Sequence, residues 1–206
     1  MGDASDGKFV VGIGGSTNAD SVTSVLLRIA LGMVAEQGAE TASFGADAMM
    51  ALPMYAPPGE SADPAPNALV DAVRRADAVI ISTPGYHGAM SGLVKNAVDH
   101  LEALRDDDRP YLEGRPVGLI VAAGGWQACG TTLVSARSVV HSLRGWPTPL
   151  GVTVNSFEQQ SGPDGRFDER VRGGLRIMSE QLIAFMSWHG ATKSPLEIGE
   201  PARATS

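Results

Sequence analysis

Short apolar runs alternate along the chain with longer segments in which apolar residues recur three and four positions apart. The runs at 9–14, 78–82 and 117–123 are almost continuously apolar, which is typical of parallel strands buried on both faces. A weak strand is expected at 41–44 and a fifth strand at 149–154. The helical spacing predicts helices at 21–37, 67–75, 93–104, 131–143 and 168–188.

This alternation predicts an α/β fold, a parallel sheet with helices on both faces. Right-handed crossovers favour a flavodoxin-like, doubly wound five-stranded parallel sheet with strand order 2-1-3-4-5. We expect one such domain at residues 9–189, a flexible N-terminus at 1–8 and a tail at 190–206. The proline-rich stretch 47–66 is expected to be a long loop that is functional or contacts a partner.

The composition excludes several classes of protein. The 206 residues are 43% apolar and carry a net charge of −7, which argues against nucleic-acid partners and against an anionic membrane surface. No apolar run approaches the ~18 residues of a membrane span, and the polar, acidic start lacks the features of a secretory signal. A single cysteine permits no intrachain disulfide. We therefore expect a cytoplasmic protein.

The turn between the first strand and the first helix is rich in hydrogen-bond donors. After Gly14 and Gly15, backbone N–H groups at the helix start, together with polar side chains, are suited to a phosphate. A Walker loop would need a lysine here, and a dinucleotide fingerprint would need a glycine at Thr17. An ordinary capped helix is the alternative interpretation. The candidate phosphate-binding residues are Ser16, Asn18, Ser21, Val22 and Thr23.

Two further loops, after the third and fourth strands, are suited to a flat ring. In the predicted topology they meet the phosphate loop at the carboxyl edge of the sheet. Their glycines leave backbone amides free, and Tyr86 can stack on a ring or line its edge. Alternatively, Tyr86 packs on the next helix and His87 is simply exposed to solvent. The candidate ring-binding residues are Pro84, Gly85, Tyr86, His87, Gly88, Gly124 and Gly125.

These motifs resemble those of a known family. The segment Pro84-Gly85-Tyr86-His87-Gly88, followed by Gly92-Leu93-Val94-Lys95-Asn96-Ala97-Val98-Asp99, is similar to the signature of the NADPH-dependent FMN reductase family, which is flavodoxin-like. The first loop is similar to that family's Gly-Ser-x-Arg-x-x-Ser pattern through Gly15, Ser16 and Ser21. The resemblance extends from about Phe9 to Phe185.

The resemblance implies an enzyme that binds FMN and transfers hydride to it from NADPH or NADH. It implies that electrons then pass to a small-molecule acceptor (free flavin, a quinone, an azo dye or a nitroaromatic) or, as reduced flavin, to a monooxygenase. It also implies a homodimer or homotetramer in which a neighbouring subunit closes the flavin site. Because the flavin carries the hydride chemistry, no side chain is expected to act as acid or base.

Two departures from the family pattern and three open alternatives qualify this picture. Asn18 stands where many members carry an arginine, and Gly85 where many carry a glutamate.

A noncatalytic flavodoxin-like electron carrier or FMN-binding module fits the same motifs. A receiver domain would need an aspartate after the third strand, where Ser82 stands. Cys129 is either a low-pKa thiol at a helix start or a small buried residue. The histidines lack metal-like spacing, so no metal is expected.

Overall fold

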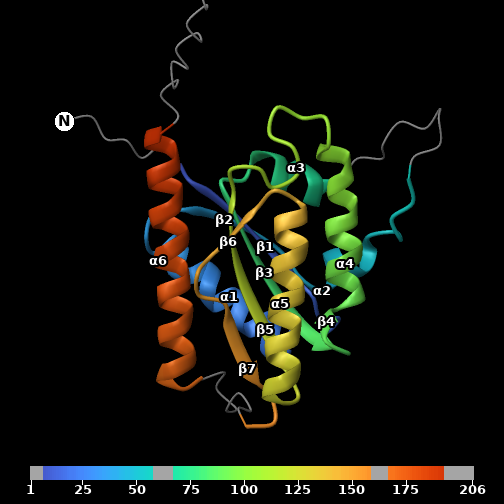
Figure 1. Cartoon of the computed structure of the whole chain (residues 1–206), viewed down its shortest axis with the longest axis vertical. Coiled ribbons are helices and arrows are strands. Elements are labelled where there is room, and N and C mark those ends of the chain that lie inside the picture. The colour runs from blue at the N-terminus through green and yellow to red at the C-terminus, as the bar shows by residue number, and fades with distance from the viewer. Residues whose placement is uncertain (1–6, 58–66, 159–166, 193–206) are drawn as a thin grey trace, which may run out of the picture.

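The computed structural model of the chain describes residues 7–57, 67–158 and 167–192 (Figure 1). Most of the expected flexible N-terminus and of the expected tail therefore lies outside the described residues. The elements are, in chain order, β1 (Phe9–Gly14), α1 (Val22–Ala35), β2 (Glu40–Phe44), α2 (Ala46–Ala51), α3 (Ala68–Arg75), β3 (Ala78–Tyr86), β4 (Ala89–Met90), α4 (Gly92–Asp99), the 3-10 helix η1 (His100–Leu104), β5 (Pro116–Ala123), α5 (Trp126–Ser142), β6 (Trp146–Pro147), β7 (Val152–Asn155) and α6 (Glu169–Thr192).

The sheet is mainly parallel and has the strand order β2-β1-β3-β5-β6. β7 also pairs with β5, and β4 pairs antiparallel with β3. The strands that correspond to the five predicted ones lie in the order β2-β1-β3-β5-β7, as expected, but the expected count of five is wrong, because the described residues form a sheet of seven strands.

Prolines explain why the outer edge of β5 carries two short strands. β6 pairs with Pro116 and Val117, whereas β7 pairs with the four residues from Ile120 to Ala123. Pro147 ends β6, and Pro149 lies between the two pairings; neither proline has an N–H to donate, so a continuous ladder is interrupted there. The last main strand consequently begins at Val152 and not at the expected residue 149.

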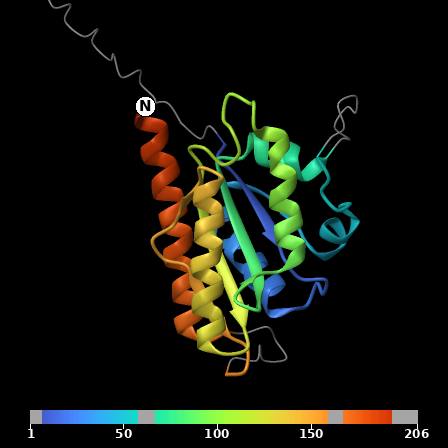
Figure 2. The ribbon, with the colours of Figure 1, turned by 45° about the vertical axis from the view of Figure 1, so that its right-hand side comes forward.

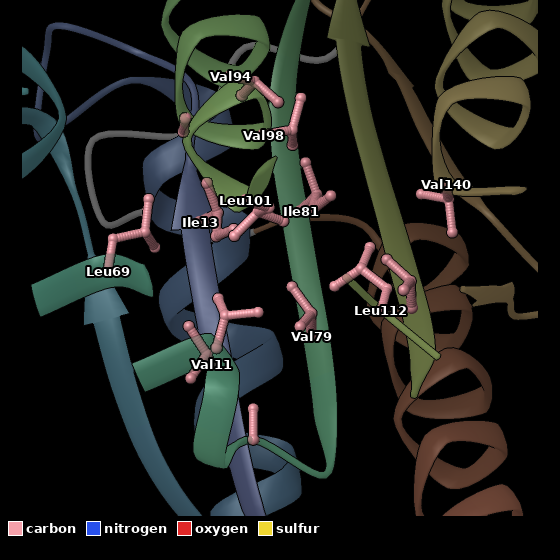
Figure 3. Close-up of a cluster of buried hydrophobic side chains, with 14 of the residues drawn as sticks. Val11, Ile13, Leu69, Val79, Ile81, Val94, Val98, Leu101, Leu112 and Val140 are labelled. Carbon is pink, nitrogen blue, oxygen red and sulfur yellow. The ribbon is translucent and has the colours of Figure 1, made fainter. Parts of the chain in front are cut away.

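Alternate strand residues face two separate helix layers. Val11, Val79 and Leu119 pack with α3, α4 and α5 on one face, in the cluster drawn in Figure 3. Val10 and Ile80 face the other way and pack with α1 and α6. Figure 2 shows α4 and α5 in front of the sheet and α1 behind it. The expectation of helices on both faces is confirmed.

Several element boundaries differ from those that the sequence predicts. A short helix, α2, occupies the start of the expected loop 47–66, and residues 58–66 of that loop lie outside the described residues. α5 begins at Trp126, five residues before the expected start, directly after Gly125. α6 continues to Thr192, beyond the expected end. Among the described residues, none of the helices has the length and hydropathy that a bilayer span requires.

Candidate functional site

The loop after β1 is bonded to the end of β3 through Gly15. The Gly15 N–H donates to the carbonyl oxygen of Ser82 at 2.7 Å, and the Gly15 carbonyl accepts from the Ser91 hydroxyl at 2.7 Å. A Cβ atom at Gly15 would lie only 2.6 Å from Val94 Cγ2. The first two predicted loops therefore meet at one edge of the sheet, and a glycine is required where they touch.

The phosphate loop is folded by its own side chains. Ser21 caps α1 by accepting from the Ser24 N–H at 3.2 Å, Ser16 Oγ accepts from the Asn18 N–H at 3.1 Å, and Asn18 Oδ1 accepts from the Asp20 N–H at 2.9 Å. Thr23 is buried, and its carbonyl accepts from the Ser82 hydroxyl at 2.8 Å. These polar side chains shape the loop as well as offering donors.

Backbone donors remain available in this loop. Within the described residues, the N–H groups of Ser16, Thr17, Val22 and Thr23 make no hydrogen bond. Two of them belong to the first turn of α1, where the helix dipole attracts negative charge. The loop can therefore hold an anion mainly through its main chain.

Arg28 brings a positive charge to the same loop. Its side chain is exposed and reaches back from α1, so that Nη1 donates to the carbonyl oxygen of Ala19 at 2.6 Å. Sequence reasoning missed this residue because it lies nine positions further along the chain, inside the helix. The loop thus has a guanidinium at its rim although Asn18 is not an arginine.

The second predicted loop is a β-hairpin. Gly85 pairs with Met90, and Tyr86 pairs with Ala89. The two residues between these strands, His87 and Gly88, have φ values of 53° and 82°, as a two-residue type I′ turn requires. The hairpin leaves the Tyr86 side chain 59% exposed, so Tyr86 does not pack into the core.

Gly85 lies directly against α5. A Cβ atom there would be 2.7 Å from Thr132 Oγ1 and 3.0 Å from the Cβ of Ala123. The buried Thr132 hydroxyl has no hydrogen-bond partner among the described residues. The glutamate that many family members carry at this position would therefore push α5 away from the hairpin.

The third loop and the start of α5 line an open cavity together with Gly88 of the hairpin. Gly125 has a φ of 109°, and its N–H donates to Asn155 Oδ1 at 2.9 Å. Gly125 is the N-cap residue of α5, and no side chain of the described residues makes a capping hydrogen bond there. The cavity has a volume of about 540 Å³ and is lined by Gly88, Gly124, Gly125, Trp126, Gln127, Ala128 and Thr131.

The cavity unites three of the predicted residues, Gly88, Gly124 and Gly125. Pro84 and Gly85 adjoin it through β3, while Tyr86 and His87 stand on the exposed hairpin. The five candidates of the phosphate loop do not line the cavity; they follow β1, the strand that pairs with β3. Sequence reasoning missed Gln127, Ala128 and Thr131, because the helix was expected to begin only at residue 131. A second cavity, of about 630 Å³, lies at the amino end of β5 around Arg144 and Trp146, away from all predicted candidates.

Three further residues that the sequence analysis named, Cys129, Lys95 and Asn96, have structural roles. Cys129 is buried in the first turn of α5, where burial raises the pKa of its thiol, so the low-pKa interpretation is wrong. Lys95 forms an ion pair with Asp99 at 2.7 Å, and Asn96 holds loop 53–55 by accepting from the Tyr55 N–H at 2.7 Å. Among the described residues, no cluster of histidine, cysteine or carboxylate side chains could hold a metal ion.

A family of known proteins shares the sequence region that contains these loops. The model of the NADPH-dependent FMN reductase family matches residues 9–159. The chain belongs to this family. The resemblance seen in the motifs is therefore confirmed, and the matched region includes all three loops and the cavity.

Named relatives and solved structures extend the comparison. FMN-dependent NADPH-azoreductases from Staphylococcus aureus strains USA300 and NCTC 8325 / PS 47 are 32% identical over 115 residues, which is 54% of this chain and 57% of theirs. The chain thus spans little more than half the length of the curated relatives it matches.

Two solved structures show that the fold is shared. The flavoenzyme NAD(P)H:(acceptor) oxidoreductase FerB from Paracoccus denitrificans has a TM-score of 0.63 and 24% identity, covering 89% of this chain and 98% of FerB. RosB with a bound riboflavin-phosphate intermediate has a TM-score of 0.71 and 13% identity, covering 90% of this chain and 81% of RosB.

Proposed function

We propose that this chain is an NAD(P)H-dependent FMN reductase that holds FMN at the carboxyl edge of β1, β3 and β5. One observation carries the proposal: the two loops that bear the family's motifs meet at one sheet edge, and at that edge the hairpin and the loop after β5 line a cavity of about 540 Å³. In open α/β sheets this edge is where ligands bind. Ligand cavities usually measure about 300–1,000 Å³, so the volume suits a flavin ring.

The residues present fit FMN. Free N–H groups at the start of α1 and the guanidinium of Arg28 suit the phosphate. The main chain of Gly88, Gly124 and Gly125 suits the ring, because glycines leave the backbone open to a close approach. Asn18 and Ser16 are proposed to set the shape of the phosphate loop through the hydrogen bonds that they accept.

When bound, FMN supplies the two-electron chemistry between reduced nicotinamide and the acceptor. The chain's contribution is to bind and orient. The uncapped N-terminus of the 17-residue helix α5 directs the positive end of its dipole towards the cavity. Negative charge that develops in the cavity is thereby stabilised without a charged side chain. No side chain is required as a proton donor in this account.

The names of the relatives suggest the substrates. The Staphylococcus aureus relatives are FMN-dependent NADPH-azoreductases, and we propose NADPH as the donor and an azo compound or quinone as the acceptor. A homodimer or homotetramer in which the neighbouring subunit closes the flavin site, and a cytoplasmic location, stay predictions. The same holds for delivery of reduced flavin to a monooxygenase.

An anaerobic reduction experiment tests the function. Purified protein loaded with FMN should lose the visible absorbance of oxidised flavin within seconds of adding NADPH, and an azo dye or quinone should restore it. Flavin that remains oxidised with both NADPH and NADH would contradict the reductase. Tight FMN binding with only slow turnover would favour the alternative, a flavodoxin-like electron carrier.

A further inference from the structure

Trp126 lies at the cavity and is contacted by two charged side chains. It is the first residue of α5, lines the cavity and is 41% exposed. Its Nε1–H donates to both carboxylate oxygens of Glu158, at 2.9 and 3.1 Å. The guanidinium of Arg170, from the first turn of α6, lies 4.8 Å from the centre of the indole ring, which is a cation–π distance.

The carboxylate that holds the indole is itself fixed. Asn155 Nδ2 donates to Glu158 Oε1 at 2.7 Å. The other amide atom, Asn155 Oδ1, accepts from the N–H groups of Gly125 and Phe157, at 2.9 and 3.1 Å. One asparagine at the end of β7 therefore positions both the glycine turn of the cavity and, through Glu158, the plane of the indole.

These contacts orient an aromatic ring that is not buried in the core. The Trp126 side chain stands partly in solvent, and it is contacted by a carboxylate from the turn after β7 and by a guanidinium from α6. Bracing removes rotational freedom before a ligand arrives, so a flat ring that stacks on the indole loses little further entropy on binding. Arg170 covers one face of the ring, and the indole also lines the cavity.

We propose that Trp126 is a stacking surface that selects planar aromatic electron acceptors next to the flavin, and that Glu158 and Arg170 are its positioning residues. This inference rests on the proposed function, because it places the acceptor beside bound FMN. It names the chemical class of the second substrate: fused or conjugated flat rings such as naphthoquinones, in preference to acceptors without an aromatic face.

The test compares two acceptors with NADPH and the FMN-loaded full chain. Each NADPH, with one proton, reduces one 1,4-naphthoquinone to its hydroquinone, or it reduces two ferricyanide ions and releases one proton. In Trp126→Leu, the ratio of kcat/KM for naphthoquinone to that for ferricyanide should fall about tenfold, because stacking is lost. The control is Trp146→Leu, on β6 at the amino end of β5, which should keep the wild-type ratio.

Positioning by Glu158 is tested by the same ratio. Glu158→Ala removes the acceptor of the indole N–H and should lower the ratio about threefold, whereas Glu158→Gln keeps an acceptor oxygen and should restore most of it. The Ala variant also serves if Trp126→Leu fails to retain FMN, because it keeps the indole.

The outcomes separate the two proposals. A wild-type chain that binds no FMN would overturn the proposed function and this inference together. A wild-type chain that binds FMN and oxidises NADPH, with an unchanged ratio in Trp126→Leu and Glu158→Ala, would overturn the inference alone. An equal fall in Trp126→Leu and Trp146→Leu would also overturn it, because the effect would then not depend on the cavity.

Discussion

The contact between the phosphate loop and α4 leads to a prediction for Gly15→Ala. The added methyl group would lie 2.6 Å from Val94 Cγ2, 2.8 Å from Ser91 Oγ and 3.1 Å from the Cα of Thr83. Val94 is fully buried and the Thr83 contact is with backbone, so neither can move away easily. Overpacking of this kind costs about 1–3 kcal/mol of unfolding free energy. In a domain of this size the melting temperature should fall by about 2–12 °C.

The same substitution at Gly32 is the matched control. Gly32 lies in the middle of α1, and a Cβ atom there has nothing within 4 Å. Alanine should stabilise this helix by about 1 kcal/mol, so the two variants should shift stability in opposite directions.

The assay is urea unfolding followed by circular dichroism, together with FMN titration. In Gly15→Ala the displaced loop should also weaken FMN binding about tenfold, since each lost hydrogen bond to a charged group costs about 1.5–3 kcal/mol. Gly32→Ala should bind FMN like the wild type. A Gly15→Ala variant with wild-type stability and wild-type FMN affinity would refute the view that this glycine is needed where the two loops touch.

Three further predictions concern single sites. Arg28→Gln should weaken FMN binding about fivefold at low salt and leave riboflavin binding unchanged, because riboflavin lacks the phosphate; an equal loss for both ligands would refute a role in binding phosphate. Gly88→Ala should cost about 1 kcal/mol in urea unfolding, because alanine is strained at a φ of 82°, whereas Gly92→Ala, with open space and no positive φ, should not. Cys129 should react with iodoacetamide far more slowly in the folded than in the urea-unfolded protein at pH 8, since burial raises the pKa of its thiol above the ordinary 9.0. Equal labelling rates would show that the thiol is not buried. Above about pH 9 the thiol ionises in the unfolded chain but stays protonated in the folded one, so the free energy of unfolding should fall as the pH rises.

The main strands could be predicted from sequence because a strand that is buried on both faces appears as a nearly unbroken run of apolar residues. Residues 78–82 and 117–123 are almost continuously apolar, and the structure places both in the centre of the sheet. The short strands could not be predicted in this way. β4 exists only because His87 and Gly88 form a tight turn, and β6 is two residues long. Neither has enough residues to show a periodic pattern.

That the loops come together could be predicted from the topology alone, because the carboxyl ends of parallel strands lie at one edge of the sheet. Side chains that reach the site from elsewhere were not predictable. Arg28 bends back from within a helix, and Glu158 lies 32 positions after the tryptophan that it holds. Such contacts depend on how α1 and the end of β7 are placed in space, which local sequence patterns do not report.

The central claim is that FMN is held by the three loops at the carboxyl edge of β1, β3 and β5. Titration of ¹⁵N-labelled protein with FMN, followed by amide NMR shifts, tests it most directly. The account predicts that the amides of Thr17, Thr23, Gly88 and Gly125 shift together along one saturable curve, while that of Gly145, at the opposite cavity, stays in place. Shifts confined to the region around Gly145, or no saturable shifts at all, would contradict it.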